Sequence, residues 1–364
     1  MRDPLRFVKP AVRGMDAYTL SPHPSKVKLN QNENPHELSD SFKRAVVERA
    51  LARPWGRYPD FFPKDLHVML ADHIGWRSDG VLVGNGSNEL IEALLVVTVG
   101  QGTRVVIPEP TFTLYGMVTA MLGGEAVRVP LDAELRYDPD ALSRARAQSG
   151  AAVTIVCSPN NPTGSSLPSG AVERLCEDDS GLVVIDEAYA EFSGWSAVPL
   201  LQRYSNLIVL RTLSKAGALA GLRIGYLLAS PELVSEVNKA RLPYSLNFFS
   251  QIAAEEILGD WEAVAERVER IVNERGVLAA ALARLSGLRC YASDANFVLV
   301  ELQDAHPVAV FEALAAEGIL VRDVSRYPGL SRHLRISVGT PDQNAALVAA
   351  LPRALALARV QVGE

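Results

Sequence analysis

Lys215 lies in the stretch with the clearest chemical potential in this sequence, Thr212-Leu213-Ser214-Lys215. It comes shortly after an apolar run, residues 207–210, that predicts a buried strand. An ammonium group at the end of a buried strand must be hydrated, paired or neutralised. A lysine that forms a Schiff base fits this position, with nearby hydroxyls and Arg223 to hold an anion. The alternative is an ordinary solvated loop lysine, and only the rest of the chain can decide between the two.

Four further side chains follow predicted strands and could share a ligand with Lys215. Asp186 follows an apolar strand, so its carboxylate needs a cationic partner such as a protonated ring nitrogen. Tyr189 and Asn161 offer a phenol and an amide, and Phe112 offers a flat face on which a ring can stack. Singly, these residues have ordinary explanations as a helix cap, a turn residue or a core residue. Together they describe a pocket for a flat aromatic cation beside a lysine, and pyridoxal 5′-phosphate is such a molecule.

The loop 84–88, Gly-Asn-Gly-Ser-Asn, lies between a predicted strand and a predicted helix. Backbone N–H groups and a hydroxyl at a helix N-terminus favour a phosphate. The same loop is also half of a dinucleotide-binding fingerprint, with Glu109 as the candidate ribose ligand, but Glu89 stands where the third glycine belongs. A nicotinamide-dependent oxidoreductase is therefore an alternative, although it leaves Lys215 and Asp186 without a role.

The elements that must position these residues alternate between apolar strands and helices from about residue 80 to 230. The strands end in polar turns at 84–88, 108–112, 157–164, 186–189 and 212–215. This alternation predicts an α/β fold in which a mostly parallel sheet is sandwiched by helices. Ligands of such sheets bind beyond the carboxyl ends of the strands, so we expect one site there.

The chain divides into three predicted parts. Residues 1–30 contain several prolines and little periodicity, which predicts an extended N-terminal arm. Residues 31–245 form the large ligand-binding domain. A long amphipathic stretch then precedes mixed strands and helices, so residues 246–364 are predicted to form a smaller α+β domain.

Composition excludes several classes of function. The formal net charge of −6 and the scattered basic residues argue against nucleic-acid binding. The sequence shows no apolar run of membrane-spanning length and no signal-peptide pattern at its start. Three widely spaced cysteines predict no disulfide framework, and we expect a cytoplasmic protein without a metal site.

Six motifs in this order carry a resemblance to a known superfamily: Asn32–Pro35, Arg57–Asp60, Ser158–Gly164, Asp186–Tyr189, Thr212–Ala216 with Gly221–Gly225, and Leu334–Thr340. Over nearly its whole length the chain resembles the fold-type I, aspartate-aminotransferase-like enzymes. Within that superfamily it is most similar to the histidinol-phosphate aminotransferases. The resemblance implies pyridoxal 5′-phosphate as the cofactor and a homodimer as the active form.

The resemblance also implies a role for each matching residue. Lys215 would bind the cofactor as a Schiff base and move the substrate's proton, Asp186 would pair with the pyridinium nitrogen, and Tyr189 with Asn161 would bond the phenolic oxygen. Phe112 and Ala188 would lie against the two ring faces. The phosphate ligands would be Asn85, Gly86, Ser87, Thr212, Ser214 and Arg223, together with Tyr58 from the neighbouring subunit.

The substrates implied are histidinol phosphate and the glutamate/2-oxoglutarate pair. Arg335 would accept the phosphate of one and the carboxylate of the other, since a planar guanidinium suits both anions. Arg322 could add a second cation, or else form a surface ion pair with Asp323. Tyr18 of the arm and Asn34 are the remaining candidate substrate ligands.

Two departures weaken the substrate assignment. His36-Glu37-Leu38-Ser39 replaces a glycine- and proline-rich stretch, and Gly217-Ala218 stands where an aromatic residue often follows. An aromatic amino acid aminotransferase and a threonine-phosphate decarboxylase are therefore alternatives with the same cofactor site. A non-catalytic regulator on this fold is a further alternative, disfavoured because the chain leaves no room for an added DNA-binding domain.

Overall fold

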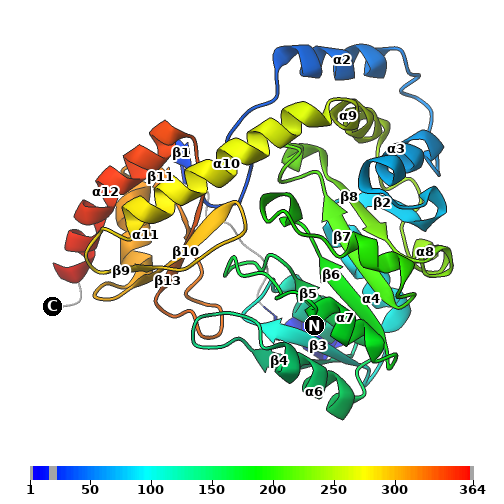
Figure 1. The fold of residues 1–364 in the computed structure, drawn as a ribbon, viewed down its shortest axis with the longest axis horizontal. Coiled ribbons are helices and arrows are strands. Elements are labelled where there is room, and N and C mark those ends of the chain that lie inside the picture. The colour runs from blue at the N-terminus through cyan, green and yellow to red at the C-terminus, as the bar shows by residue number, and fades with distance from the viewer. Residues whose placement is uncertain (1–2, 16–22, 361–364) are drawn as a thin grey trace.

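The computed structural model of the chain describes residues 3–15 and 23–360. Within these residues the largest sheet has seven strands in the order β2-β8-β7-β6-β5-β3-β4 (Figure 1). Neighbouring strands are parallel except for β8, which runs antiparallel to both β2 and β7. The strands are β2 (Val81–Asn85), β3 (Arg104–Glu109), β4 (Glu125–Pro130), β5 (Val153–Cys157), β6 (Leu182–Asp186), β7 (Leu207–Thr212) and β8 (Ile224–Leu228).

The central strands are buried on both faces. Val183, Val184 and Ile185 of β6 have no exposed surface, and β5 and β7 are buried along their whole length. Continuous runs of β-branched residues are typical of strands covered by helices on both sides. The main core of the protein therefore lies between this sheet and its helices.

The helices around this sheet begin where the sequence provides capping groups. Asp138 accepts hydrogen bonds from the first backbone N–H groups of α6, and Ser230 does the same for α8. Both helices also have proline in their first turn, where its missing N–H costs nothing. The helices are α3 (Lys64–Ile74), α4 (Ser87–Thr98), α5 (Leu114–Met121), α6 (Pro139–Ser149), α7 (Ala171–Glu177) and α8 (Pro231–Asn238).

A second, antiparallel sheet has the order β12-β13-β10-β9 in the described chain. Helices α11 and α12 pack against one another beside it (Figure 1). The elements are β9 (Leu288–Cys290), β10 (Phe297–Leu302), α11 (Pro307–Ala316), β12 (Arg322–Asp323), β13 (His333–Ser337) and α12 (Pro341–Val360). This is the smaller α+β segment that the sequence predicts after the large sheet.

Two helices link the two sheets. Helix α9 (Phe248–Gly259) packs against α2 (Asp40–Leu51) and α3, and α10 (Trp261–Leu282) continues from it to the second sheet (Figure 1). The single amphipathic stretch of the sequence is therefore two helices that meet at Asp260. The domain boundary between residues 245 and 246 stays a prediction.

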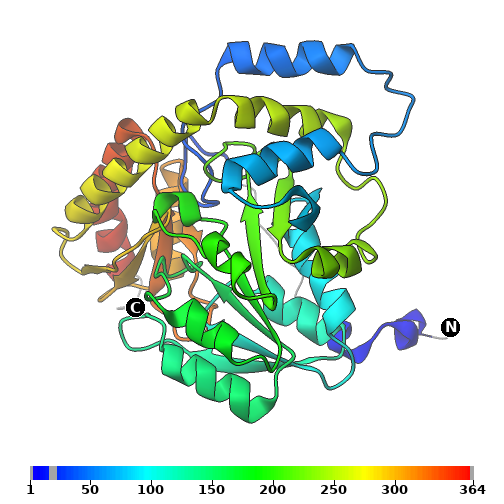
Figure 2. The same ribbon diagram turned by 45° about the vertical axis from the view of Figure 1, so that its right-hand side comes forward.

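The N-terminal arm is less extended than its prolines suggest. Short helices η1 (Pro4–Phe7) and α1 (Pro10–Arg13) lie at the end of the molecule away from α12, with α1 against α5 (Figure 2). Strand β1 (Val27–Lys28) pairs in parallel with β11 (Ile319–Leu320) of the smaller segment. The remaining short helices are η2 (Ser78–Gly80), η3 (Ala190–Phe192), η4 (Val198–Gln202) and η5 (Ala220–Leu222).

The α/β class with a mostly parallel, helix-covered sheet and a smaller α+β segment is confirmed. Across residues 3–15 and 23–360, we find no helix that combines the length and the hydrophobicity needed to span a lipid bilayer.

Candidate active site

A cavity of about 210 Å³ lies at the carboxyl ends of the parallel strands. Strand ends β5, β6 and β7, the starts of α4 and α5, the loop after Lys28 and strand β13 all contribute to it. The lining residues are Asn30, Gln31, Asn32, Ser87, Asn88, Phe112, Tyr115, Cys157, Asn161, Asp186, Ala188, Tyr189, Thr212, Ser214, Lys215, Arg223 and Arg335. The structure thus brings together most of the residues singled out in the sequence, as expected for the carboxyl edge of such a sheet.

Asp186 ends β6 inside this cavity and is buried. Its Oδ2 accepts a 2.6 Å hydrogen bond from the hydroxyl of Tyr115, and its Oδ1 accepts one from the backbone N–H of Ala188 at 3.1 Å. Burial raises the pKa of Asp186, and these two donors oppose that rise by stabilising the carboxylate. The pair of donors also fixes the orientation of the carboxylate.

Lys215 lies three residues beyond β7, with its amine in the cavity. Nζ donates a 3.0 Å hydrogen bond to the carbonyl oxygen of Gln31 and lies 5.8 Å from the ring centre of Tyr189. Burial, together with the positive charge of Arg335, lowers the pKa of Lys215 to about 7. At neutral pH a large fraction of this amine is therefore uncharged and nucleophilic.

Arg335 connects the second sheet to the cavity. From β13 its Nη1 donates a 2.5 Å hydrogen bond to Asn161 Oδ1, and its Nη2 donates one to the carbonyl oxygen of Asn30 at 2.8 Å. Asn32 Nδ2 donates to the hydroxyl of Tyr189 at 3.1 Å. Burial raises the pKa of Tyr189, although Arg335 and Asn32 act in the opposite direction. The phenol is therefore a neutral hydrogen-bonding group at neutral pH.

The far end of the cavity suits an anion. Arg223 has φ 55°, a left-handed conformation that non-glycine residues rarely adopt, and its Nη1 lies 3.4 Å from Ser214 Oγ. Gly86 has φ 80°, and a Cβ there would collide with the Arg223 guanidinium. Thr212 Oγ1 donates to Ser214 Oγ at 2.9 Å. Two hydroxyls, a guanidinium and the N-terminus of α4 thus face one space.

Comparison with known proteins decides which kind of site this is. Residues 24–351 match the family of class I and II aminotransferases. This chain belongs to the class I and II aminotransferases. It is 39% identical over 352 residues to a histidinol-phosphate aminotransferase of Chlorobium phaeovibrioides, covering 96% of this chain and 97% of that protein.

Solved structures agree with this assignment. The histidinol-phosphate aminotransferase of Sinorhizobium meliloti, solved in complex with pyridoxal 5′-phosphate, matches with a TM-score of 0.86 and 28% identity, covering 96% and 98% of the two chains. The L-threonine-O-3-phosphate decarboxylase of Porphyromonas gingivalis matches with a TM-score of 0.79 at 24% identity, covering 91% and 99%, and so shows the shared fold alone. The predicted superfamily resemblance is confirmed.

The residues of this aminotransferase fit pyridoxal phosphate. The ligand would need a carboxylate for its ring nitrogen, a reactive amine, a flat hydrophobic neighbour and a phosphate site. Asp186, Lys215 and Phe112 line the same cavity. The guanidinium of Arg223 occupies the space that a side chain at position 86 would fill. The fit rests on the type and location of these groups.

Several predicted residues lie outside the lining of this cavity. Asn85 is exposed, and its N–H donates to Glu89 Oε2 at 2.5 Å. Asn34 Nδ2 donates to the carbonyl oxygen of Ala216 at 3.0 Å, so it contacts the lysine loop. Tyr58 is 81% exposed and stacks on Tyr244 with ring centres 4.6 Å apart. The predicted roles of these residues stay untested by the geometry of one chain.

The other two predicted substrate ligands are Arg322 and Tyr18. Arg322 lines an adjoining cavity of about 960 Å³ that also contacts Asn30 and Phe112 of the first one. It is the cross-strand partner of Arg335 in the β12–β13 pairing. Tyr18 lies outside the described residues.

Sequence reasoning missed several lining residues. Tyr115, the donor to Asp186, comes one helical turn after Phe112, and that spacing could have suggested a shared direction. Asn32 belongs to the Asn32–Pro35 motif, in which only Asn34 is predicted as a ligand. Asn88 and Cys157 lie in the predicted polar turns 84–88 and 157–164 without an assigned role, and Asn30 and Gln31 precede the motif. Within residues 3–15 and 23–360, no cluster of side chains has the composition of a metal site.

Proposed function

We propose that this aminotransferase uses pyridoxal 5′-phosphate to exchange the amino group of histidinol phosphate with 2-oxoglutarate, forming glutamate. The observation that carries the proposal is one cavity that holds a half-buried lysine with a lowered pKa, a buried aspartate and two arginines. The names of the curated relatives support the choice of substrate.

Bound pyridoxal phosphate supplies an electron sink for the charge left when a proton departs from the carbon that carries the amine. Asp186 would hold the ring nitrogen, because the Tyr115 hydroxyl and the Ala188 N–H orient its carboxylate and favour its ionised form against the effect of burial. Phe112 and Ala188 would lie against the ring faces, and Tyr189 with Asn161 would bond the phenolic oxygen. Arg223, Ser214, Thr212 and Ser87 would hold the phosphate.

Lys215 would act first as a general base, removing the proton from the substrate carbon that carries the amine, and then as a general acid that donates the proton again. A general base works best when its pKa lies near the working pH, and burial sets the pKa of this amine to about 7. The Gln31 carbonyl holds the amine in the cavity at 3.0 Å. Base catalysis of this kind contributes on the order of 10²–10⁴-fold.

Arg335 and Arg322 would hold the anionic end of each substrate. They are directly opposed on neighbouring strands, so one anion could contact both guanidinium groups. A guanidinium fork accepts phosphate and carboxylate equally well, which suits histidinol phosphate in one half-reaction and glutamate in the other. The adjoining cavity of about 960 Å³ would take the substrate's side chain. Asn34 and Tyr18 remain proposed secondary contacts.

A homodimer is part of the proposal. Trp55, Tyr58 and Leu242 are 68%, 81% and 70% exposed, and Phe61, Phe62 and Tyr244 add further exposed rings nearby. Exposed apolar groups gathered in this way favour burial against another protein surface. Tyr58 would then reach the phosphate of the neighbouring subunit. A cytoplasmic location is the remaining proposal, based on three free cysteines in the described chain.

The decisive experiment compares three amino donors with the purified, cofactor-loaded protein. Histidinol phosphate, phenylalanine and threonine phosphate are each supplied with 2-oxoglutarate, and both glutamate and carbon dioxide are measured. We expect kcat/KM for histidinol phosphate to exceed that for phenylalanine by at least about tenfold, equivalent to one well-placed ionic contact. A preference for phenylalanine would replace the substrate assignment, and carbon dioxide release from threonine phosphate would indicate the decarboxylase.

A further inference from the structure

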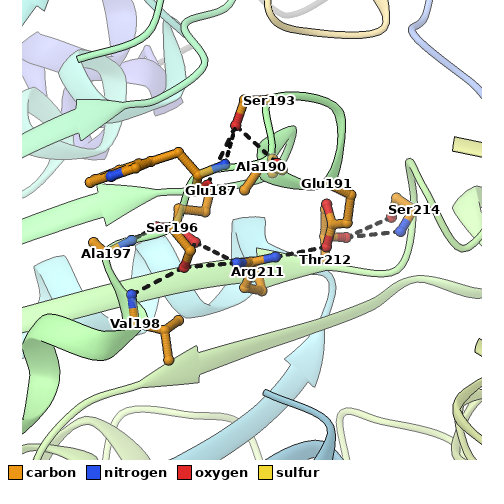
Figure 3. Close-up of polar contacts among 12 residues, drawn as sticks. Glu187, Ala190, Glu191, Ser193, Ser196, Ala197, Val198, Arg211, Thr212 and Ser214 are labelled. Carbon is orange, nitrogen blue, oxygen red and sulfur yellow. Dashed lines mark hydrogen bonds and ion pairs between the residues drawn. The ribbon is translucent and has the colours of Figure 1, made fainter. Parts of the chain in front are cut away.

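A buried charged cluster lies directly behind the cavity, although none of its charged residues lines it. Arg211 of β7 lies between Glu187, which follows β6, and Glu191 of η3 (Figure 3). Its Nη2 is 2.7 Å from Glu187 Oε2, and its Nη1 is 2.9 Å from Glu191 Oε1. The Ser196 hydroxyl contacts both Glu187 and Arg211, at 2.8 and 2.9 Å. The side chain of Glu187 is completely buried and that of Arg211 is 7% exposed.

The pairing of β6 with β7 explains why this cluster lies opposite the cavity. Asp186 is aligned with Leu210, so Glu187 lies beside Arg211 one position further on. Side chains alternate between the faces of a sheet, so Asp186 and Thr212 share the cavity face while Glu187 and Arg211 share the other. Each partner of the ion pair is therefore the immediate chain neighbour of a residue that lines the cavity.

The backbone hydrogen bonds between β6 and β7 end beside the Glu187–Arg211 ion pair. The Glu187 N–H donates to the carbonyl oxygen of Leu210 at 2.9 Å. Beyond this bond, within residues 187–215, no backbone hydrogen bond joins the segment after β6 to the segment after β7. The Arg211 contacts thus take the place of the sheet ladder exactly where the chain leaves for Tyr189 on one side and Lys215 on the other.

Electrostatics make this connection stiff. Burial disfavours the charge on Arg211, but Glu191 and Glu187 outweigh it, so the pKa of the guanidinium is raised and the group stays charged. Burial raises the pKa of Glu187, and Arg211 opposes that rise. Removing one member of such a buried set leaves an uncompensated charge, so the members hold each other in place.

We propose that Arg211 is a positioning residue that fixes the separation between the Asp186–Tyr189 segment and the Lys215 segment by bridging Glu187 and Glu191. This inference rests on the proposed roles of Asp186 and Lys215 at opposite ends of one small ring. A catalytic group displaced by about 1 Å can lose on the order of 10²-fold in rate, so a rigid spacing matters.

The test uses the full-length protein and the variants Arg211→Met, Arg211→Lys and Glu187→Gln. Three quantities are measured: the affinity of the apoprotein for pyridoxal phosphate by fluorescence, the pH midpoint of the visible band of the bound cofactor, and the thermal unfolding temperature. We expect Arg211→Met to weaken pyridoxal phosphate binding by about tenfold or more, within the usual coupling between members of one buried network. The pH midpoint should shift in the same variant, and Arg211→Lys should recover part of both effects.

Arg146→Met provides the matched control. Arg146 is also a buried arginine, and its guanidinium contacts Thr154 of β5 and the Leu182 carbonyl at the start of β6, at the amino end of the same strands. Its loss should lower the unfolding temperature but leave cofactor affinity and the pH midpoint within about twofold of the wild type, since sites far apart are usually independent.

Equal effects of Arg146→Met and Arg211→Met on affinity and midpoint, at equal losses of stability, would overturn the proposal. If Arg211→Met does not fold, Arg211→Lys and Glu187→Gln decide, and wild-type affinity with a wild-type midpoint in both would likewise overturn it. Failure of the proposed function has a different signature, because the wild-type protein itself would then bind no pyridoxal phosphate or keep its visible band in Lys215→Ala.

Discussion

Two buried arginines stabilise opposite edges of the seven-stranded sheet with different partners. At the amino edge, Arg146 of α6 donates to the carbonyl oxygens of Asp178, Gly181 and Leu182 and to the Thr154 hydroxyl. At the carboxyl edge, Arg211 pairs with two carboxylates. Burial lowers the pKa of Arg146, whereas the carboxylates raise that of Arg211.

This difference shows where the protein concentrates charge. Neutral acceptors dominate around Arg146, with Asp178 Oδ2 at 3.5 Å as its one ion-pair contact in the described chain. At the carboxyl edge, Asp186 and Lys215 line the cavity and the Glu187–Arg211 ion pair lies behind it, and the pKa values of all four groups are shifted. Clustered pKa shifts in a cleft are typical of functional sites. We therefore expect mutations at the carboxyl edge to change function and mutations at the amino edge to change stability.

The largest expected effect is that of Lys215→Ala. Removing the amine removes both the proposed covalent attachment and the proposed base, so turnover should fall by at least about 10²–10⁴-fold. The visible band of the lysine-bound cofactor should disappear with it. Steady-state assays and an absorbance spectrum measure both, with Lys239→Ala, an exposed lysine paired with Glu236, as the control. A variant that retained both the visible band and the turnover rate would contradict the proposed role of Lys215.

Arg146→Met should have the largest effect at the amino edge. It removes a guanidinium donor from the part-buried carbonyl oxygens of Leu182 and Gly181, and each such loss costs about 1–3 kcal/mol. Urea unfolding of the apoprotein should show a decrease of about 3 kcal/mol in the free energy of unfolding. A decrease of similar size from Arg174→Ala, an exposed partner of Asp140 on the same side, would mean that burial is not the cause.

Tyr115→Phe should have an intermediate and mainly functional effect. Loss of the 2.6 Å hydrogen bond removes a donor that stabilises the ionised form of Asp186. A hydrogen bond to a charged group is worth about 1.5–3 kcal/mol, so the affinity for pyridoxal phosphate should fall by about tenfold or more. Fluorescence titration of the apoprotein measures it. Phe112→Leu changes the neighbouring ring without touching Asp186. A larger loss of cofactor affinity in Phe112→Leu than in Tyr115→Phe would contradict a leading role for the Tyr115–Asp186 hydrogen bond.

The pH dependence should also distinguish the two edges. Lys215 has a pKa lowered to about 7, and its uncharged form is the proposed base, so the rate should rise as pH increases through about 7. A rate profile from pH 6 to 9 measures this, and Arg146→Met should show the same midpoint as the wild type. A midpoint that moves in Arg146→Met would show that the two edges are coupled.

The smallest expected effect concerns the stability of the apoprotein. Asp186 has a folded-state pKa raised above its unfolded value, so its favourable contribution is complete below the unfolded pKa and is lost as pH rises through the folded one. Asp186→Asn removes this penalty and should stabilise the apoprotein at neutral pH by about 1 kcal/mol while weakening cofactor binding. Thermal unfolding at pH 5 and pH 8 should show the gain mainly at pH 8. A gain that is equal at both values would rule out ionisation as its cause.

The sequence alone determined the α/β sheet and the polar ends of its strands. Runs such as residues 182–185 are rich in β-branched residues and favour a strand buried by helices on both sides. Asp186 follows such a run directly, and Asn161 and Lys215 lie a few residues beyond β5 and β7. The parallel direction of these strands brings their ends to one edge. The position of these residues at one edge depends only on chain order and strand direction, and both can be predicted from the sequence.

Tertiary structure alone decided the contacts that depend on how separate elements dock. Tyr115 reaches Asp186 because of the rotation of α5, and Arg335 reaches Asn161 because β13 of the second sheet borders the cavity. Arginine is usually a surface residue, so the sequence gives no reason to expect Arg211 and Arg146 in the interior. Only the folded chain shows that both are buried, with partners far away in the sequence. A side chain's burial is a property of everything packed around it, so local pattern cannot report it.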